Sequence, residues 1–205
     1  MIQQLLDDHN INQEGVFDLL TSLSETGVDY ADLYFQHSEA ESWMLDEGIV
    51  KDGSYHISHG VGARSVVGDK TGFSYSDNLN LKAIQGAIDF AKGISETPRL
   101  LKPKILQEAP TQAKYPALSP LGSLTSEEKV NVLRQIDAIA RKEKKVKQVS
   151  ASLSGAYTEV LIASTDGVYQ MDYRPMVRIS VSVVVEKNGR VEQASSGGGG
   201  RYDYR

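Results

Sequence analysis

The stretch Val177–Glu186, "VRISVSVVVE", decides the fold class of this chain. Apolar residues occupy every second position of it: Val177, Ile179, Val181, Val183 and Val185. Arg178, Ser180, Ser182 and Glu186 alternate with them. A period of two is typical of a β-strand with one face in the core and one in solvent. Because Asn188-Gly189 follows, the pattern predicts an antiparallel strand that turns back on itself.

Further strands are predicted on both sides of this stretch. "TEVLIASTDGVYQMD" predicts a hairpin around Thr165-Asp166-Gly167, and the alternation through "VSASLSGAYTEVLIA" changes phase near Gly155, which indicates a bulge or a strand break. Nearer the N-terminus, turns at "DEG" and "GDK" separate apolar pieces. These pieces predict an antiparallel meander: "DLYFQ", "ESWML", "IVKDGSY", "GVGARSVV" and "TGFSYS".

Three segments have the apolar spacing of amphipathic helices. The first has a helical period at Val16, Leu19, Leu20 and Leu23, with Asn12 as N-cap and Gly27 after its end. The second has Leu81, Ile84, Ile88 and Ala91 on one face and closes at Gly93. The third starts at a capping box of Thr125 and Glu128 and presents Val132, Leu133, Ile136, Ile139 and Ala140.

The predicted elements are arranged as an α+β fold, a mostly antiparallel sheet with packed helices. Residues 1–94 form helix, meander and helix, residues 95–124 a Pro-rich connection, and residues 125–205 helix and meander. We therefore expect two similar halves, each a helix plus a four-stranded meander. The second half stops after "SSGGGGRYDYR", before the helix that would match the first, so we expect that its continuation is missing.

Composition excludes several classes of protein. The 205 residues contain no cysteine, which excludes disulfides and a thiol nucleophile. A net charge of −5 argues against nucleic-acid binding, and no apolar run has the length of a membrane span. The N-terminus lacks the basic and apolar regions of a secretory signal. We expect a cytoplasmic protein without nucleic-acid or membrane partners.

The glycine run near the C-terminus is the first candidate functional region. Gly197, Gly198, Gly199 and Gly200 precede Arg201, and neither GK[ST] nor a helix start follows, so a phosphate-binding loop is disfavoured. Glycines let another backbone approach closely, which favours a peptide-docking edge or a domain junction. A flexible exit loop is the alternative interpretation.

A second candidate region lies at the first predicted hairpin. Asp46, Glu47 and Asp52 flank turns, where solvated acidic residues are common, and Lys51 and Tyr55 could line a groove beside them. The four histidines, His9, His37, His56 and His59, form no HExxH motif, and GxSxG is absent as well. We therefore assign no catalytic residue and no metal ligand in this chain.

Several long blocks resemble the TldD branch of the TldD/PmbA family. They are "DLYFQHSEAESWMLDEGIVKDGSYHISHGVGARSVVGDKTGFSYSD", "ASLSGAYTEVLIASTDG", "RPMVRISVSVVVE" and "ASSGGGGRYDY", in the family's order. The resemblance implies a cytoplasmic zinc-dependent peptidase of the type first described as a modulator of DNA gyrase, whose metal is held by an HExxxH motif. That motif has no counterpart here, so the chain is similar to the N-terminal half only.

The resemblance also implies partners. The expected ones are a C-terminal catalytic domain that holds the zinc, a TldE/PmbA-like paralogue or a second copy, and an unfolded peptide substrate. On this interpretation the chain is inactive alone, helps enclose the active site, guides peptides and forms dimer contacts, and the glycine run lies towards the catalytic half. A protein-binding module without proteolytic activity, similar to a gyrase modulator, is the alternative.

Overall fold

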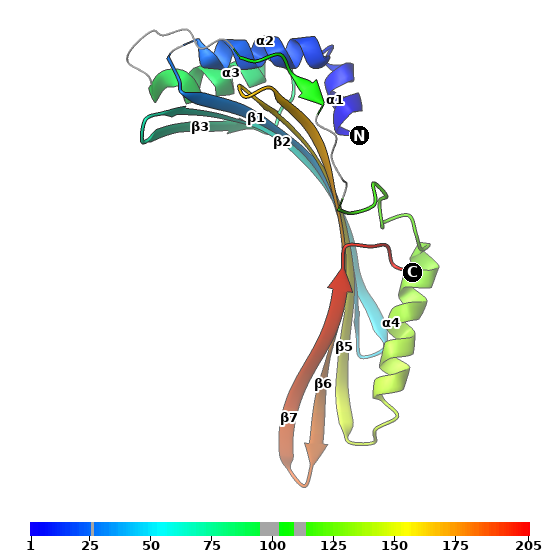
Figure 1. Cartoon of the computed structure of the whole chain (residues 1–205). Helices are drawn as coiled ribbons and strands as arrows, with labels where there is room; N and C mark the ends of the chain where they lie inside the picture. Colours follow the sequence, from blue (N-terminus) through cyan, green and yellow to red (C-terminus); the bar gives the residue numbers. More distant parts are fainter. Residues whose placement is uncertain (26, 95–102, 109–113) are drawn as a thin grey trace. The chain divides into compact units, whose positions relative to one another are not determined.

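The computed structural model describes residues 1–25, 27–94, 103–108 and 114–205 (Figure 1). The described residues form four α-helices and a seven-stranded sheet, which confirms the α+β prediction. Two parts of the predicted connection, residues 95–102 and 109–113 with Pro98 and Pro110, lie outside the described residues. The elements in chain order are α1 (Ile2–Asp8), α2 (Gln13–Ser24), β1 (Tyr30–Asp46), β2 (Ile49–Val67), β3 (Lys70–Ser76), α3 (Leu81–Ala91), the 3₁₀ turn Lys92–Ile94, β4 (Gln107–Glu108), α4 (Ser126–Ala140), β5 (Val146–Ser164), β6 (Val168–Lys187) and β7 (Arg190–Gly200).

The sheet has the strand order β3-β2-β1-β5-β6-β4, and β7 also pairs with β6. The β2–β3 and β6–β7 ladders are antiparallel, whereas the short β4 runs parallel to β6. The predicted hairpin at Asn188-Gly189 is confirmed, because Lys187 pairs with Arg190 across the two turn residues. Both turn residues have positive φ, +53° and +77°, as a type I′ turn requires.

Residues 1–94 and residues 125–205 each contain three strands and not the four that we predicted, because two of the predicted strands merge into one long strand. "DLYFQ" and "ESWML" are parts of β1, because the polar residues between them continue the alternation and His37 and Glu41 are buried on the same face as Phe35. The predicted break near Gly155 is also wrong. β5 runs without interruption, and Gly155 instead leaves room for the Tyr204 ring.

The three predicted helices are present with the caps that the sequence indicates. The side chains of Asn12 and Asn80 accept from the backbone N–H groups of Gly15 and Ala83, and Thr125 and Glu128 form a reciprocal capping box on α4. The helix α1 was not predicted, because it has only seven residues and no side-chain cap. Its Ile2 and Leu6 are fully buried.

The chain divides into two compact units. Unit 1 comprises Met1–Ser38, Ser58–Ala113 and Glu159–Asp172, and unit 2 comprises Glu39–Ile57, Lys114–Thr158 and Tyr173–Arg205. In unit 1, α2 and α3 cover one face of β1, β2 and β3 (Figure 1). Their apolar residues, among them Leu20 and Ile84, form one large core with Leu33, Phe35 and Ala63 of the strands.

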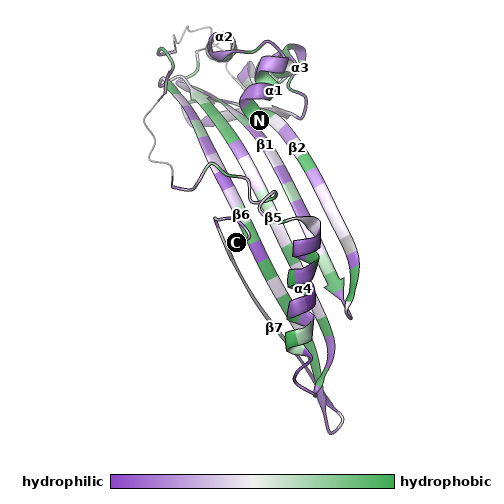
Figure 2. Cartoon of the chain, turned by 90° about the vertical axis from the view of Figure 1, so that its right-hand side faces the viewer, coloured by the Kyte–Doolittle hydropathy of each residue, from purple (hydrophilic) through white to green (hydrophobic). Residues whose placement is uncertain are grey.

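Unit 2 has a sheet in the order β2-β1-β5-β6-β7, with α4 packed on one face. Its core is small: Leu45, Leu133, Ala151 and Leu153 are buried, and Trp43, Val50, Ile136, Ile179 and Tyr204 pack against them. Hydrophilic and hydrophobic residues alternate along β6 (Figure 2). Of the alternating apolar residues from Val177 to Val185, however, only Val177 is buried, and Val181, Val183 and Val185 are half-buried.

Candidate functional site

The glycine run forms the end of an edge strand and not a loop. Gly197 to Gly200 belong to β7 and pair with Ser180 to Val177 of β6, and no described strand pairs with the other edge of β7. A Cβ atom at Gly197 would lie 2.6 Å from the Ile179 carbonyl oxygen, and one at Gly199 would overlap the Val177 carbonyl oxygen. At these two positions, therefore, the close approach of the β6 backbone requires glycine.

The free edge of β7 carries a regular set of backbone groups. In a two-residue hairpin the residues that flank the turn are a hydrogen-bonded pair, and paired and outward-facing positions then alternate along the strand. Counting from Arg190, the outward N–H and C=O groups belong to Val191, Gln193, Ser195, Gly197 and Gly199. All of β7 from Arg190 to Gly199 is exposed. This edge offers an extended peptide a complete row of hydrogen-bonding partners.

The sheet face opposite α4 in unit 2 is covered by short side chains. Ala151, Leu153 and Ile179 pack towards α4, so the alternate residues of β5 and β6 point to the other face. The middle of this face carries small or hydroxylated residues: Ser150, Ser152, Ser154, Ser180, Ser182, Ser195 and Gly197. Longer side chains flank them on β6, Arg178 on one side and Glu186 on the other, so a backbone could approach closely only in the middle.

The segment after β7 is held in unit 2 by a buried polar cluster. The Lys129 Nζ lies 2.6 Å from Glu41 Oε1 and donates to the Leu121 carbonyl oxygen at 2.7 Å. Tyr204 donates its hydroxyl to Glu41 Oε1 at 2.9 Å, and Trp43 donates Nε1–H to Glu41 Oε2 at 3.1 Å. Lys129 and Glu41 are 3% and 9% exposed, so each charge depends on the other for compensation.

Aromatic rings and a glycine complete this cluster. The Lys129 ammonium lies 5.8 Å from the centroid of the Trp43 ring and 5.3 Å from that of Tyr204, within the range of cation–π attraction. Gly155 is required here, because a Cβ atom would overlap the Tyr204 hydroxyl. Burial, followed by the hydrogen bond to Glu41, raises the pKa of Tyr204 above its ordinary range. The C-terminal segment is therefore fixed to the covered face of unit 2.

A cavity of about 230 Å³ lies beside this cluster. It is bounded by α4, by the glycine end of β7 and by the C-terminal segment, and its lining includes Val132, Ile179, Gly198 and Tyr202. The guanidinium of Arg201 lies 5.0 Å from the centroid of the Tyr115 ring. Arg201 is thus held in a cation–π contact within unit 2.

The structure does not bring the two predicted candidate regions together. Lys51 and Tyr55 lie on β2, which is the opposite edge of the unit 2 sheet from β7. Lys51 is exposed, and Tyr55, 58% exposed, donates its hydroxyl to Glu39 Oε2 at 2.8 Å. Partial desolvation, then this hydrogen bond, raises the pKa of Tyr55.

Lys129 and Glu41 were not predicted as functional residues. The available signal was that Glu41 and Trp43 lie two residues apart on one predicted strand and therefore share a face.

Groups of metal-binding side chains were sought among the described residues. No group of three or more His, Asp or Glu side chains in this part of the chain could hold a metal ion. The rings of His37 and His59 stack with centroids 6.4 Å apart, but no carboxylate joins them in such a group. No helix in the described residues is long and apolar enough to span a membrane.

Comparisons with known proteins identify relatives over nearly the whole chain. Residues 31–95 match domain 1, and residues 119–205 the central domain, of the PmbA/TldA metallopeptidases. A "Metalloprotease TldD homolog" of Haemophilus influenzae is 46% identical over 201 residues, which are 97% of this chain and 42% of that protein. One from Buchnera aphidicola subsp. Schizaphis graminum is 43% identical, over 98% of this chain and 42% of its own length.

A solved structure shares the fold. TldE from Thermococcus kodakarensis superposes with a TM-score of 0.69 over 91% of this chain and 43% of that one, at 16% sequence identity. The chain thus spans about two fifths of the length of the curated relatives that it matches. On the matches to both family domains and the long alignments with TldD homologues, the chain belongs to the TldD/PmbA metallopeptidase family.

Proposed function

We propose that this chain is the non-catalytic N-terminal part of a TldD-type zinc metallopeptidase. In the whole protein it helps enclose the active site, guides unfolded peptides and contributes contacts to a second subunit, either another copy or a TldE/PmbA-like paralogue. Two facts support a non-catalytic role. The matched family domains are the first and the central one, and the described residues contain no group that could hold a metal.

The free edge of β7 is the observation that carries this proposal. It offers outward N–H and C=O groups from Val191 to Gly199 beside a sheet face of short side chains. An unfolded peptide added as a further strand would be held through its backbone, which suits substrates of many sequences. The fixed C-terminal segment, with Tyr204 in the buried cluster, lies beside the glycine end of β7.

Ser195 provides a direct test, because its N–H faces away from β6. We expect Ser195→Pro to remove one hydrogen bond to the peptide without breaking the β6–β7 ladder. Ser195→Ala is the matched control, since it keeps the N–H. In the peptidase-competent protein that contains this chain, kcat/KM for a disordered fluorogenic peptide should fall about fivefold to tenfold with proline only. Equal values for the two variants would remove β7 as the peptide guide.

A further inference from the structure

The cavity of about 230 Å³ in unit 2 lies against the glycine end of β7. Side chains line it on the other sides, among them Val132 of α4, Ile179 of β6 and Tyr202 of the C-terminal segment. On the side of β7 its lining residues are Gly198 and Gly199, which have no side chains. The cavity is therefore not closed by side chains towards the strand whose outer edge is free.

Gly198 differs from the glycines on either side of it. Cβ atoms at Gly197 and Gly199 would come too close to carbonyl oxygens of β6, whereas one at Gly198 would meet nothing within 4 Å. The φ angle of Gly198 is not positive either, so the backbone does not require glycine. Glycine inside a strand weakens the strand. Its effect at this position is to leave the cavity open at β7.

Two other strand glycines of unit 2 are covered by aromatic rings. A Cβ atom at Gly155 would overlap Tyr204, and one at Gly200 would overlap the ring of Tyr202. A ring that packs over a strand glycine supplies the apolar contact that the glycine cannot make. Gly198 lies two residues from Gly200, on the same face of β7, and no described ring covers it. An aromatic side chain from another molecule fits this position.

An antiparallel peptide strand added to β7 would direct one side chain towards the cavity. Gly197 and Gly199 carry the outward N–H and C=O groups, so the peptide residue between them lies opposite Gly198 in a non-hydrogen-bonded pair. In such a pair the Cα atoms are about 4.5 Å apart, and both side chains point to the same face. For Gly198 this is the face of α4, because its partner Ile179 packs towards α4.

The size and lining of the cavity favour an aromatic ring. A cavity of about 150 Å³ in another protein holds a benzene molecule, so about 230 Å³ is sufficient for a phenylalanine side chain. The two charged lining residues, Arg178 and Asp203, have opposite signs, and charge therefore gives no preference. The ring of Tyr202 supplies an aromatic wall, against which a second ring packs well.

We propose that this cavity receives one aromatic side chain of the peptide that pairs with β7. The chain then selects unfolded segments with phenylalanine, or a similarly large apolar residue, at the position opposite Gly198. This inference rests on the proposed function of β7 as a peptide guide. It adds a side-chain preference to a contact that otherwise involves only the peptide backbone.

A series of substrates measures the preference. The peptidase-competent protein that contains this chain is given disordered fluorogenic peptides of serine, threonine and glutamine, each with a single phenylalanine at a different position. A peptide without phenylalanine is the reference. We expect kcat/KM to rise about tenfold or more when phenylalanine occupies one particular position, because its ring is then buried.

Two variants of β7 assign this preference to the cavity. Gly198→Val fills the opening with a residue that favours strands, so it should abolish the preference for phenylalanine. The kcat/KM of the reference peptide and the melting temperature should not fall. Ala194→Val is the matched control on the same face, away from the cavity lining, and should keep the preference.

The outcomes separate this proposal from the proposed function. A preference that persists in Gly198→Val, or an equal fall of kcat/KM for both peptides, would overturn the aromatic site and leave the β7 guide in place. Ser195→Pro should lower kcat/KM for both peptides, since it removes a backbone hydrogen bond. If Ser195→Pro has no effect on either peptide, the β7 guide itself is wrong, and the aromatic site is wrong with it.

Discussion

The cores of the two units are built differently. In unit 1, three helices bury a continuous apolar cluster in which Leu20, Phe35 and Ile88 are completely enclosed. In unit 2, a single helix covers a five-stranded sheet, the buried apolar cluster beneath it has only four members, and a lysine and a glutamate are buried as well. Both units bury paired charges, since in unit 1 Glu159 lies 2.9 Å from the Met1 ammonium and Asp32 is paired with Arg64. Unit 1 adds a much larger buried apolar cluster, so charge compensation has the greater relative weight in unit 2.

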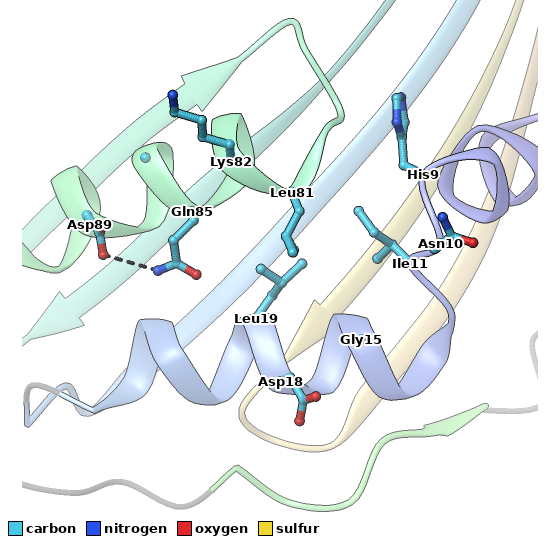
Figure 3. A pocket seen from close by; sticks show the side chains of 11 residues that line it. His9, Asn10, Ile11, Gly15, Asp18, Leu19, Leu81, Lys82, Gln85 and Asp89 are labelled. Atoms are coloured by element: carbon cyan, nitrogen blue, oxygen red, sulfur yellow. Dashed lines mark hydrogen bonds between the residues drawn. The ribbon is translucent and has the colours of Figure 1, made fainter.

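This difference shows where each unit can accept other molecules. Unit 1 has one face covered by helices, and its pockets include a groove between α2 and α3 (Figure 3) and a hollow beside β2 and β3 that Tyr34, His59 and Phe73 line. Unit 2 leaves two strand edges, a face of short side chains and half-buried valines on β6 accessible. In unit 2, a small core and one buried polar cluster together hold the C-terminal segment in a single position, and most of the sheet surface remains accessible.

The largest expected effect is the loss of a large side chain from the core of unit 1. Phe35→Ala should lower the free energy of unfolding by about 3–5 kcal/mol, because it removes buried apolar area and leaves a cavity. Val183→Ala, on the half-buried face of β6, should cost less than about 1 kcal/mol. Urea unfolding of both variants measures the difference. Equal losses would show that the valine face of unit 2 is as well packed as the core of unit 1.

The second expected effect concerns the charge pair of unit 2. Lys129→Met should lower the free energy of unfolding by about 3 kcal/mol, because Glu41 stays buried without its cation. Adding Glu41→Gln should restore much of that loss, since the neutral amide can still bond with Trp43 and Tyr204. Urea unfolding of the single and double variants gives the coupling energy. If the losses of Lys129→Met and Glu41→Gln simply add in the double variant, the two charges are not energetically coupled.

The sequence predictions succeeded for local elements and failed for contacts between residues far apart in the chain. Local signals were sufficient for the capped helices α2, α3 and α4 and for the hairpin at Asn188-Gly189, since each is specified by neighbouring residues. Contacts between distant residues were not predictable. Lys129, in the first turn of α4, has the sequence environment of a solvated residue and is buried only because Tyr204 and Glu41 meet it from elsewhere.

The candidate site illustrates the same limit. Four consecutive glycines indicate a loop by propensity, yet Gly197 to Gly200 form a strand because the β6 backbone pairs with them and leaves no room for side chains at Gly197 and Gly199. Likewise, the separation of Lys51 and Tyr55 from the glycines depends on strand order, which a single sequence does not specify. The role of these residues as a peptide guide or domain junction stays a prediction.

The smallest expected effect isolates the Tyr204 hydroxyl. Tyr204→Phe keeps the ring over Gly155 and Lys129 but removes the hydrogen bond to Glu41, which should cost about 1.5 kcal/mol because the acceptor is charged. The free energy of unfolding at neutral pH, compared with that of the unmodified chain, measures this loss. No change would mean that water replaces the hydroxyl at Glu41.

The same variant predicts a pH dependence with a definite sign. The pKa of Tyr204 is raised in the folded chain above its ordinary value of 10.0, first by burial and then by Glu41. Neutral tyrosine is therefore favoured by folding, and this contribution is complete below pH 10.0 and decreases as pH rises above it. Tyr30 and Tyr55 shift in the same direction, so the difference between the unmodified chain and Tyr204→Phe is the informative quantity. That difference should shrink as pH rises through 10.0. If the difference stays constant, the pKa of the Tyr204 hydroxyl is the same in the folded and the unfolded chain, and burial beside Glu41 does not favour its neutral form.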